Sequence, residues 1–288
     1  MPAFHLYLPQ LRLSVDDIVT RALAAEAAGF EGIAFMDHMA PPLAGDQDYW
    51  EALTVASWVL ARTSRLRVGH LVLCDGFRHP AVLARQAVSL DHASGGRFEL
   101  GIGWGSVPSE FDVFGLGATD AAHRVTRLRE TLEVLRLLWT GEPVDFESSH
   151  FTLRGAQQRP TPLTRIPVTI GGAGPRTLAL VRDYADWWNV PVNQVDLLDQ
   201  RRELAGDARV SIQQLVAVVP SESQRADVTA QATRRFGGYG SLVIGTVDEL
   251  RAHFAALEVR GVERVYTWFA DFAPVATLEH FAELIANL

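Results

Sequence analysis

Strand-like and helix-like segments alternate from one end of the chain to the other, and this alternation constrains the fold more than any other feature. Apolar runs typical of buried strands occupy 4–9, 32–38, 66–74, 97–103, 166–172, 186–191, 209–219 and 262–269. Repeated strand–helix units of this size form parallel strands with right-handed crossovers. About eight units predict an α/β fold, a closed (β/α)8 TIM barrel. An open, doubly wound sheet is the alternative.

The helix boundaries carry signals of their own. Ser14 and Asp17 form a capping-box pattern before a helix that Gly29 closes, and Thr246 is expected to cap a later helix. The clearest helix spans 121–139, where apolar residues recur every three or four positions: Val125, Leu128, Leu132, Leu135 and Trp139. Other helices are expected at 49–61, 80–92, from 175, before 209, at 245–257 and at 274–288. Residues 140–165 are rich in Pro, Gly and Ser, which predicts an excursion longer than a standard turn, and no linker divides the single domain expected over residues 1–288.

The composition excludes several classes of function. All 26 basic residues are arginine, so a lysine Schiff base and a P-loop lysine are both impossible. The net charge of −8 argues against a nucleic-acid partner, because phosphate-binding surfaces are normally basic. No apolar run approaches the roughly 18–20 residues that span a membrane, and the residues before the first strand do not show the pattern of a secretory signal, so neither a membrane span nor a signal is expected. With a single cysteine, Cys74, the chain is expected to be cytoplasmic.

Two glycine-rich stretches follow strand-like segments, and either could serve a nucleotide. SGGRFELGIGWG (94–105) fits a dinucleotide-binding turn poorly, because the next convincing helix starts only near Ala121. Its glycines either leave room for a flat ligand at a barrel mouth or allow the strand to bend and approach its neighbour. IGGAG (170–174) is the better phosphate site. Backbone N–H groups of Gly171, Gly172, Ala173 and Gly174 at a helix start could face an anion, helped by Arg176.

Taken together, several motifs resemble the bacterial luciferase-like superfamily of flavin- and deazaflavin-dependent oxidoreductases. They are FMDH (35–38), FRHPAVLARQAVSLDHASGGRFELGIGWG (77–105), Glu110, HRVTRLRETLEVLRLLWTG (123–141), PVTIGGAG (167–174) and ADWWN (185–189). The resemblance implies a (β/α)8 barrel with an insertion near the middle and a cofactor across the barrel mouth. Gly103 and Gly105 would then back the cofactor ring, and residues 171–174 would hold its phosphate.

The resemblance also points to acid–base residues. His38 corresponds to a histidine near the redox-active edge of the ring, where an imidazole can give or take a proton near neutral pH. A structural or capping histidine is the alternative. Asp37 either holds His38 or contacts the cofactor. Glu110 is the remaining acidic candidate, with a cofactor contact and a helix cap as its two interpretations.

The third strand and its neighbours complete the predicted cofactor site. By resemblance, the Leu71–Val72 peptide bond is cis and supports the ring; an ordinary buried strand is the alternative. Cys74 is expected to line the ring pocket as a small apolar residue, and Asn189 to lie near the cofactor. His5 and His70 join the pocket only if they face the mouth.

Two positions depart from the sugar-phosphate dehydrogenases of this superfamily. Ser106 stands where those enzymes have a glutamate, and Pro42 where they have a tryptophan. A sugar-phosphate substrate is therefore not expected, although Ser106 still belongs to the predicted cofactor site.

These observations favour an oxidoreductase that transfers a hydride between coenzyme F420, an 8-hydroxy-5-deazaflavin, and a small-molecule substrate. An FMN-dependent luciferase-like monooxygenase and a non-catalytic flavin-binding protein are the alternatives. No histidine spacing suits a metal site, so no metal is expected. By resemblance, the chain is expected to form a homodimer.

Overall fold

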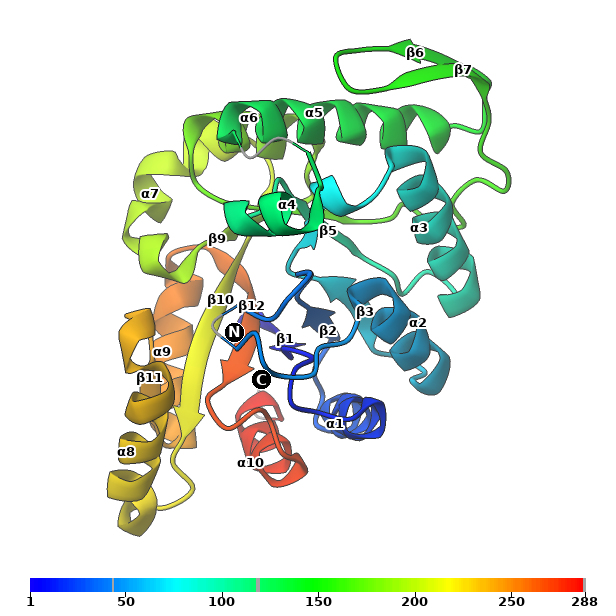
Figure 1. Ribbon diagram of the computed structural model, residues 1–288. Coiled ribbons are helices and arrows are strands. Elements are labelled where there is room, and N and C mark those ends of the chain that lie inside the picture. The colour runs from blue at the N-terminus through cyan, green and yellow to red at the C-terminus, as the bar shows by residue number, and fades with distance from the viewer. Residues whose placement is uncertain (43, 118–119, 287–288) are drawn as a thin grey trace.

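Parallel strands form the centre of the molecule, in a computed structural model that describes residues 1–42, 44–117 and 120–286 (Figure 1). They are β1 (Ala3–Tyr7), β2 (Gly32–Phe35), β3 (Arg67–His70), β4 (Leu73–Cys74), β5 (Leu100–Gly103), β8 (Val168–Gly171), β9 (Trp187–Val190), β10 (Arg209–Val218) and β12 (Val262–Phe269). Their order in the sheet is β3-β2-β1-β12-β10-β9-β8-β5-β4. The first and last strands of the chain are thus neighbours, with Ala3 opposite Arg264.

The sheet closes on itself through the third strand. β3 and β4 are two parts of that strand, separated by Leu71 and Val72. The Val68 N–H donates to the Arg97 carbonyl at 3.0 Å, and β4 pairs with β5 through Leu73 and Ile102. The predicted barrel is therefore confirmed, and the open doubly wound sheet is excluded because its two edges would remain unpaired.

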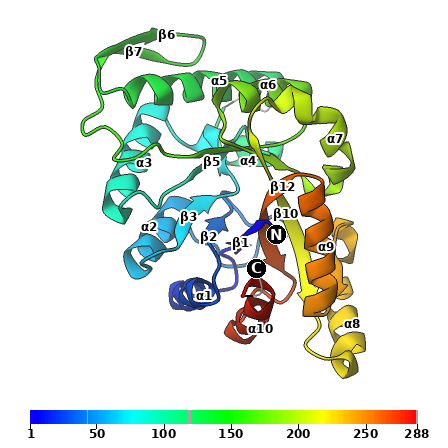
Figure 2. The same cartoon turned by 180° about the vertical axis from the view of Figure 1, so that it is seen from behind.

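Helices surround the barrel on its outside (Figures 1 and 2). They are α1 (Val15–Ala27), α2 (Ala52–Arg62), α3 (Pro80–Ser94), α5 (Ala121–Leu138), α6 (Pro175–Tyr184), α7 (Leu198–Arg201), α8 (Arg225–Phe236), α9 (Val247–Val259) and α10 (Val275–Ile285). Two capping boxes begin where the sequence predicts them, at Ser14 before α1 and at Thr246 before α9. The predicted end of the last helix, 287–288, lies outside the described residues. No helix in the described part of the chain is both long and apolar enough to cross a membrane.

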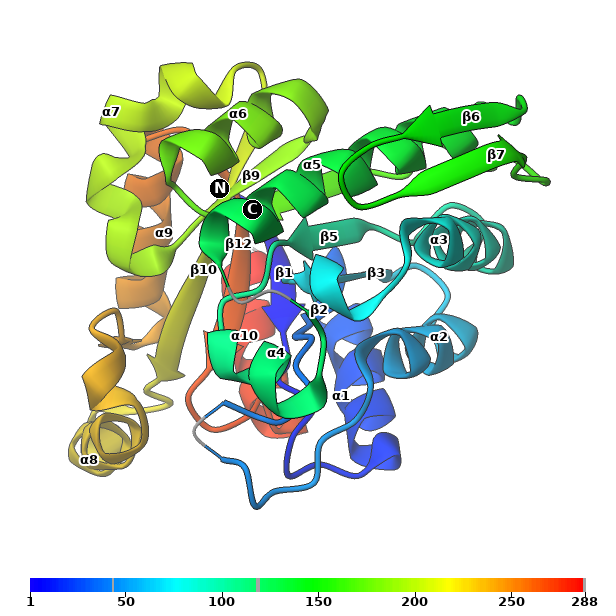
Figure 3. The same cartoon turned by 45° about the horizontal axis from the view of Figure 1, so that its top comes forward.

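Several elements differ from the sequence prediction. A short helix, α4 (Pro108–Phe114), precedes α5 and lies at one end of the barrel (Figure 3). Its seven residues bury only Glu110 and Phe111, which is too little for a periodic apolar pattern. The stretch 140–165 contains an antiparallel hairpin of β6 (Val144–Glu147) and β7 (Thr152–Ala156), which projects beside α5. Between β10 and α9 lie α8 and a short strand, β11 (Val243–Gly245), neither of which was predicted.

A buried ionic cluster fills the end of the barrel where the strands begin. Arg264 donates to Glu99 at 2.7 and 3.2 Å, and its guanidinium lies 3.9 Å from the ring centre of Trp187. Arg67 donates to the same carboxylate at 2.5 Å. Burial raises the pKa of Glu99, but Arg264, His5 and Arg67 outweigh it and lower the value to about 2. Glu99 is therefore ionised, and its charge is compensated inside the barrel.

Candidate active site

A cavity of about 460 Å³ opens at the other end of the barrel, where the strands end. Active sites of (β/α)8 barrels are built at this end. All the residues predicted as catalytic or cofactor-binding line this one cavity, here called the mouth pocket: Asp37, His38, Leu71, Val72, Cys74, Gly103, Gly105, Ser106, Glu110, Gly171, Gly172, Ala173, Gly174 and Asn189. The chain therefore gathers the predicted residues in space, although their binding roles stay predictions.

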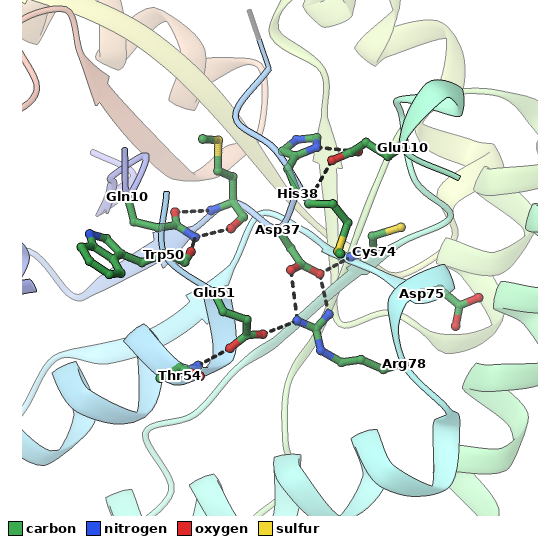
Figure 4. Close-up of polar contacts among 12 residues, drawn as sticks. Gln10, Asp37, His38, Trp50, Glu51, Thr54, Cys74, Asp75, Arg78 and Glu110 are labelled. Atoms are coloured by element: carbon green, nitrogen blue, oxygen red, sulfur yellow. Dashed lines mark hydrogen bonds and ion pairs between the residues drawn. The ribbon is translucent and has the colours of Figure 1, made fainter. Parts of the chain in front are cut away.

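His38 and Glu110 form a pair at the rim of this pocket (Figure 4). His38 Nδ1 lies 3.0 Å from Glu110 Oε2, and the carboxylate also accepts the Met39 N–H at 2.6 Å. Glu110 lies in the first turn of α4 but does not cap that helix. Its side chain reaches the 38–40 segment instead, a role that neither sequence interpretation foresaw. With Nδ1–H donated to Glu110, His38 Nε2 is left as the proton acceptor.

The segment carrying His38 is held on several sides. The Gln10 amide donates to the Met36 carbonyl at 2.6 Å and accepts the Met36 N–H at 3.2 Å. The Tyr49 hydroxyl accepts the His38 N–H at 3.1 Å and donates to the Met36 carbonyl at 2.8 Å. These contacts fix the backbone before and at His38, so its imidazole has a defined position.

Asp37 does not hold His38. Its carboxylate accepts two bonds from Arg78, at 2.5 and 3.0 Å, and one from the Cys74 N–H at 2.8 Å. Arg78 also donates to Glu51 at 2.5 Å. Burial raises the pKa of Glu51, yet hydrogen bonds from Thr54 and Arg78 bring it down to about 2. Asp37 thus links the end of β2 to β4 through the Cys74 N–H, and to the residue before α3 through Arg78.

The cis peptide bond expected in the third strand is present. The Leu71–Val72 peptide bond is cis, and both residues line the mouth pocket. Burial raises the pKa of the Cys74 thiol to about 12, so this side chain stays a neutral thiol near pH 7. That agrees with the interpretation of Cys74 as a small apolar wall residue.

The glycines of the fourth strand make room for the third strand. A Cβ at Gly101 would lie 1.7 Å from the His70 carbonyl oxygen, and one at Gly103 would lie 2.7 Å from Val72 Cγ2. Gly105 has a φ of +85°. Gly101 and Gly103 therefore allow the neighbouring strand to approach closely, and the predicted role of Gly103 and Gly105 behind a cofactor ring stays a prediction.

One of the four amides predicted to face an anion, in the glycine turn before α6, is already used within the protein. The Gly172 N–H donates to the Asn189 carbonyl at 3.1 Å, so this amide belongs to the sheet and is not free to face an anion. The Ala173 carbonyl accepts a bond from Arg201, and a Cβ at Gly174 would meet nothing within 4 Å. The anion-binding prediction therefore rests on the remaining amides at the start of α6, where the helix dipole favours negative charge.

The remaining residues that the sequence singled out lie at this pocket or in the interior of the protein. Asn189 lines it, and the Asn189 Oδ1 accepts the Ser211 hydroxyl at 3.2 Å. Trp187 and Trp188 are buried packing residues. His5 and His70 are buried and do not line the mouth pocket. Burial lowers the pKa of His70 to about 4.

Sequence reasoning missed some residues of the pocket. They are Leu73, Trp104, Thr177, Pro191, Gln194 and Gln213. No motif marks Gln194 or Gln213, whereas Trp104 stands inside the quoted glycine motif and could have been noted. No group of three or more His, Cys, Asp or Glu side chains within the described ranges is placed to share a metal ion.

Comparisons with known proteins agree with this architecture. The family model of luciferase-like monooxygenases matches residues 3–209. An F420-dependent glucose-6-phosphate dehydrogenase of Microbacterium testaceum (strain StLB037) is 28% identical over 229 residues, 76% of this chain and 68% of that protein. One from Mycolicibacterium fortuitum is 35% identical over 164 residues, 55% of this chain. The chain spans about half the length of that relative, 48%.

Solved structures show the same fold. An F420-dependent secondary alcohol dehydrogenase, solved with an F420–acetone adduct, superposes with a TM-score of 0.83 at 18% identity over 99% of this chain and 98% of that one. A monooxygenase from Streptomyces bottropensis reaches the same TM-score of 0.83 at 20% identity, covering 99% of both chains. With the family model spanning well over half of the sequence, the chain belongs to the luciferase-like monooxygenase family.

Proposed function

We propose that the protein is an oxidoreductase that transfers a hydride between coenzyme F420 and a small organic substrate at the mouth of the barrel. The observation that carries the proposal is the His38–Glu110 pair, which lies 3.0 Å apart at the rim of a pocket lined by the start of α6. The names of the curated relatives, F420-dependent dehydrogenases, support the choice of coenzyme.

The residues of the mouth pocket suit a flat, anionic cofactor. Leu71 and Val72 form one wall, and Gly103 and Gly105 line the same pocket without side chains of their own. The start of α6 offers backbone amides, and Gly174 leaves open space beside them. We infer that these elements would hold the deazaflavin ring and its phosphate, with Asn189 beside the ring.

His38 would act as the general base, and in the reverse direction as the general acid. When bound, the deazaflavin supplies a two-electron hydride acceptor or donor. In the oxidation of an alcohol, the O–H bond breaks and its proton passes to His38 Nε2, while the C–H bond breaks and its electron pair leaves with the hydrogen as hydride. Glu110 stabilises the imidazolium that forms and keeps Nδ1 protonated. In the reverse direction, His38 returns the proton to the carbonyl oxygen.

Titration of both cofactors into the purified chain tests the coenzyme. The fluorescence of each cofactor reports its binding, and we expect F420 to bind more tightly than FMN. Tighter binding of FMN by tenfold, about 1.4 kcal/mol, would contradict the proposal and favour an FMN-dependent monooxygenase. The family's own description favours this second candidate, as does the monooxygenase with the same fold.

The variant His38→Ala tests the proton transfer. Coenzyme affinity should change little, because ring burial and backbone amides provide most of the binding. Single-turnover hydride transfer should slow by about 10²–10⁴, the usual effect of a lost acid–base group. Normal binding together with the wild-type rate would rule out this role for His38.

A further inference from the structure

We propose that a second cavity beside the mouth pocket binds the substrate, and that this substrate is an apolar, ring-containing molecule carrying an anionic group. The assignment rests on the proposed function, because the substrate must reach the reacting edge near His38. The second cavity has a volume of about 550 Å³. It is here called the aromatic chamber.

The aromatic chamber and the mouth pocket share one wall. His38, Leu71, Ser106 and Gln213 line both cavities. A molecule in the chamber would therefore meet a ligand of the mouth pocket next to His38. The two positions that depart from the sugar-phosphate dehydrogenases, Ser106 and Pro42, also line the chamber.

Tyrosine, phenylalanine and tryptophan rings make up much of the lining of the chamber. Trp268 is the centre of this group, with ring centres 5.6 Å from Tyr7, 5.1 Å from Phe236 and 5.3 Å from Tyr239. Phe272 packs against Phe236 at 6.1 Å. Such a wall favours a flat apolar body, which gains from both burial and edge or face contacts with the rings.

The arginine and carboxylate side chains that line the chamber within the described residues are all of one sign. Arg12 and Arg235 line it, and its described lining contains no Asp or Glu. Neither arginine forms an ion pair within the described part of the chain, and Arg235 donates only to the Ala270 carbonyl, at 3.2 Å. Burial raises the pKa of Tyr7 above its ordinary value, so this phenol adds no negative charge. In a chain of net charge −8, this local positive rim favours an anionic group on the ligand.

The same lining is poorly suited to a sugar. A hexose presents hydroxyls on every side, and each one needs a polar partner when it is buried. Beyond the two arginines, the polar side chains of the chamber are few: Tyr7, His38, Ser106, Gln213, Tyr239 and the Trp268 indole, whose N–H has no partner within the described part of the chain. Opposite the aromatic rings, several hydroxyls would lose their hydrogen bonds to water without replacement.

A matched pair of probes tests both parts of the proposal. 2-Naphthoate carries the ring system and a charge, whereas 2-naphthamide has nearly the same shape without the charge. Calorimetric titration of the full chain, with and without coenzyme, should show naphthoate binding more tightly by roughly threefold or more. In the double variant Arg12→Gln, Arg235→Gln that preference should disappear while naphthamide binds as before.

Variants of the aromatic wall should weaken both probes. Trp268→Leu should raise both dissociation constants by about tenfold, since aromatic anchors dominate such pockets. Tyr239→Ala, at a half-exposed position, is the second variant in case Trp268→Leu fails to fold. Trp58→Leu and Arg154→Gln are the matched controls, because these exposed residues line neither cavity.

Three outcomes would overturn the assignment. The two probes could bind equally well, the control variants could weaken probe binding as much as the aromatic-wall variants do, or glucose 6-phosphate could displace naphthoate. The last would indicate a sugar-phosphate site. If the naphthoate preference holds but neither coenzyme binds, the proposed function fails and the ligand class of the chamber stands. If coenzyme F420 binds and the preference for naphthoate is absent, the proposed function stands and the ligand class of the chamber fails.

Discussion

Replacing Glu110 by Gln should reverse the protonation pattern of His38. In the native chain the Glu110 carboxylate can only accept, so the hydrogen on His38 lies on Nδ1, 3.0 Å away. In Glu110→Gln, the amide oxygen can still accept the Met39 N–H, a contact of 2.6 Å in the native chain. The amide NH₂ then faces Nδ1, which must become the acceptor. His38 Nε2 would carry the hydrogen and could no longer take a proton from a substrate.

The size of the effect follows from these contacts. Because one hydrogen bond to the 38–40 segment survives and the other is replaced, the free energy of unfolding should fall by only about 1 kcal/mol. The rate of hydride transfer should fall by about 10²–10⁴, equivalent to roughly 3–5 kcal/mol, since the proton acceptor is lost. Coenzyme affinity should stay close to that of the native chain.

Nitrogen-15 NMR of the imidazole rings reads the tautomer without any knowledge of the substrate. The signals of His38 among the nine histidines are assigned with a His38→Gln variant. Glu51→Gln is the matched control, because Glu51 is bonded to Arg78 and Thr54 and does not touch His38. The reasoning is refuted if Glu110→Gln keeps the hydrogen on Nδ1, or if transfer runs at the native rate with the tautomer reversed.

Four further predictions concern stability and assembly. Glu99→Gln should cost about 3–5 kcal/mol in urea unfolding at pH 7, because it leaves Arg264 buried with a neutral partner; a cost below 1 kcal/mol would show that the cluster is not ionised. The pKa of Glu99 drops from 4.5 to about 2 on folding, so about 3 kcal/mol of native stability should be lost as the pH falls from 4.5 towards 2, and Glu99→Gln should lose correspondingly less over that range. Gly101→Ala should prevent folding or lower the melting temperature sharply, because its Cβ would meet the His70 carbonyl at 1.7 Å, whereas Gly45→Ala, with nothing within 4 Å, should melt like the native chain. Light scattering at micromolar concentration should give the mass of a homodimer, and a monomer mass would contradict that prediction.

Local pattern was enough to predict most of the scaffold. The alternation of strands and helices, and the capping boxes at Ser14 and Thr246, depend on residues a few positions apart, so the sequence displays them directly. Two helices with weak apolar periodicity were not predicted, because α4 buries two residues and α8 buries only Ala232 and Phe236. A short or mostly exposed helix leaves little apolar signal, because its stability comes from its surroundings.

The sequence also predicted which residues meet at the mouth, since strand ends of a parallel barrel gather at one edge. It could not predict what those residues do to each other. Glu110 reaches His38 across 72 positions, and Gly172 gives its N–H to Asn189 across the sheet. The aromatic chamber likewise depends on Tyr7 and Trp268 lying side by side, because β1 pairs with β12 only once the barrel closes. Such partners carry no spacing signal along the chain, so the closed barrel alone decides which polar groups are already used and which remain free for a ligand.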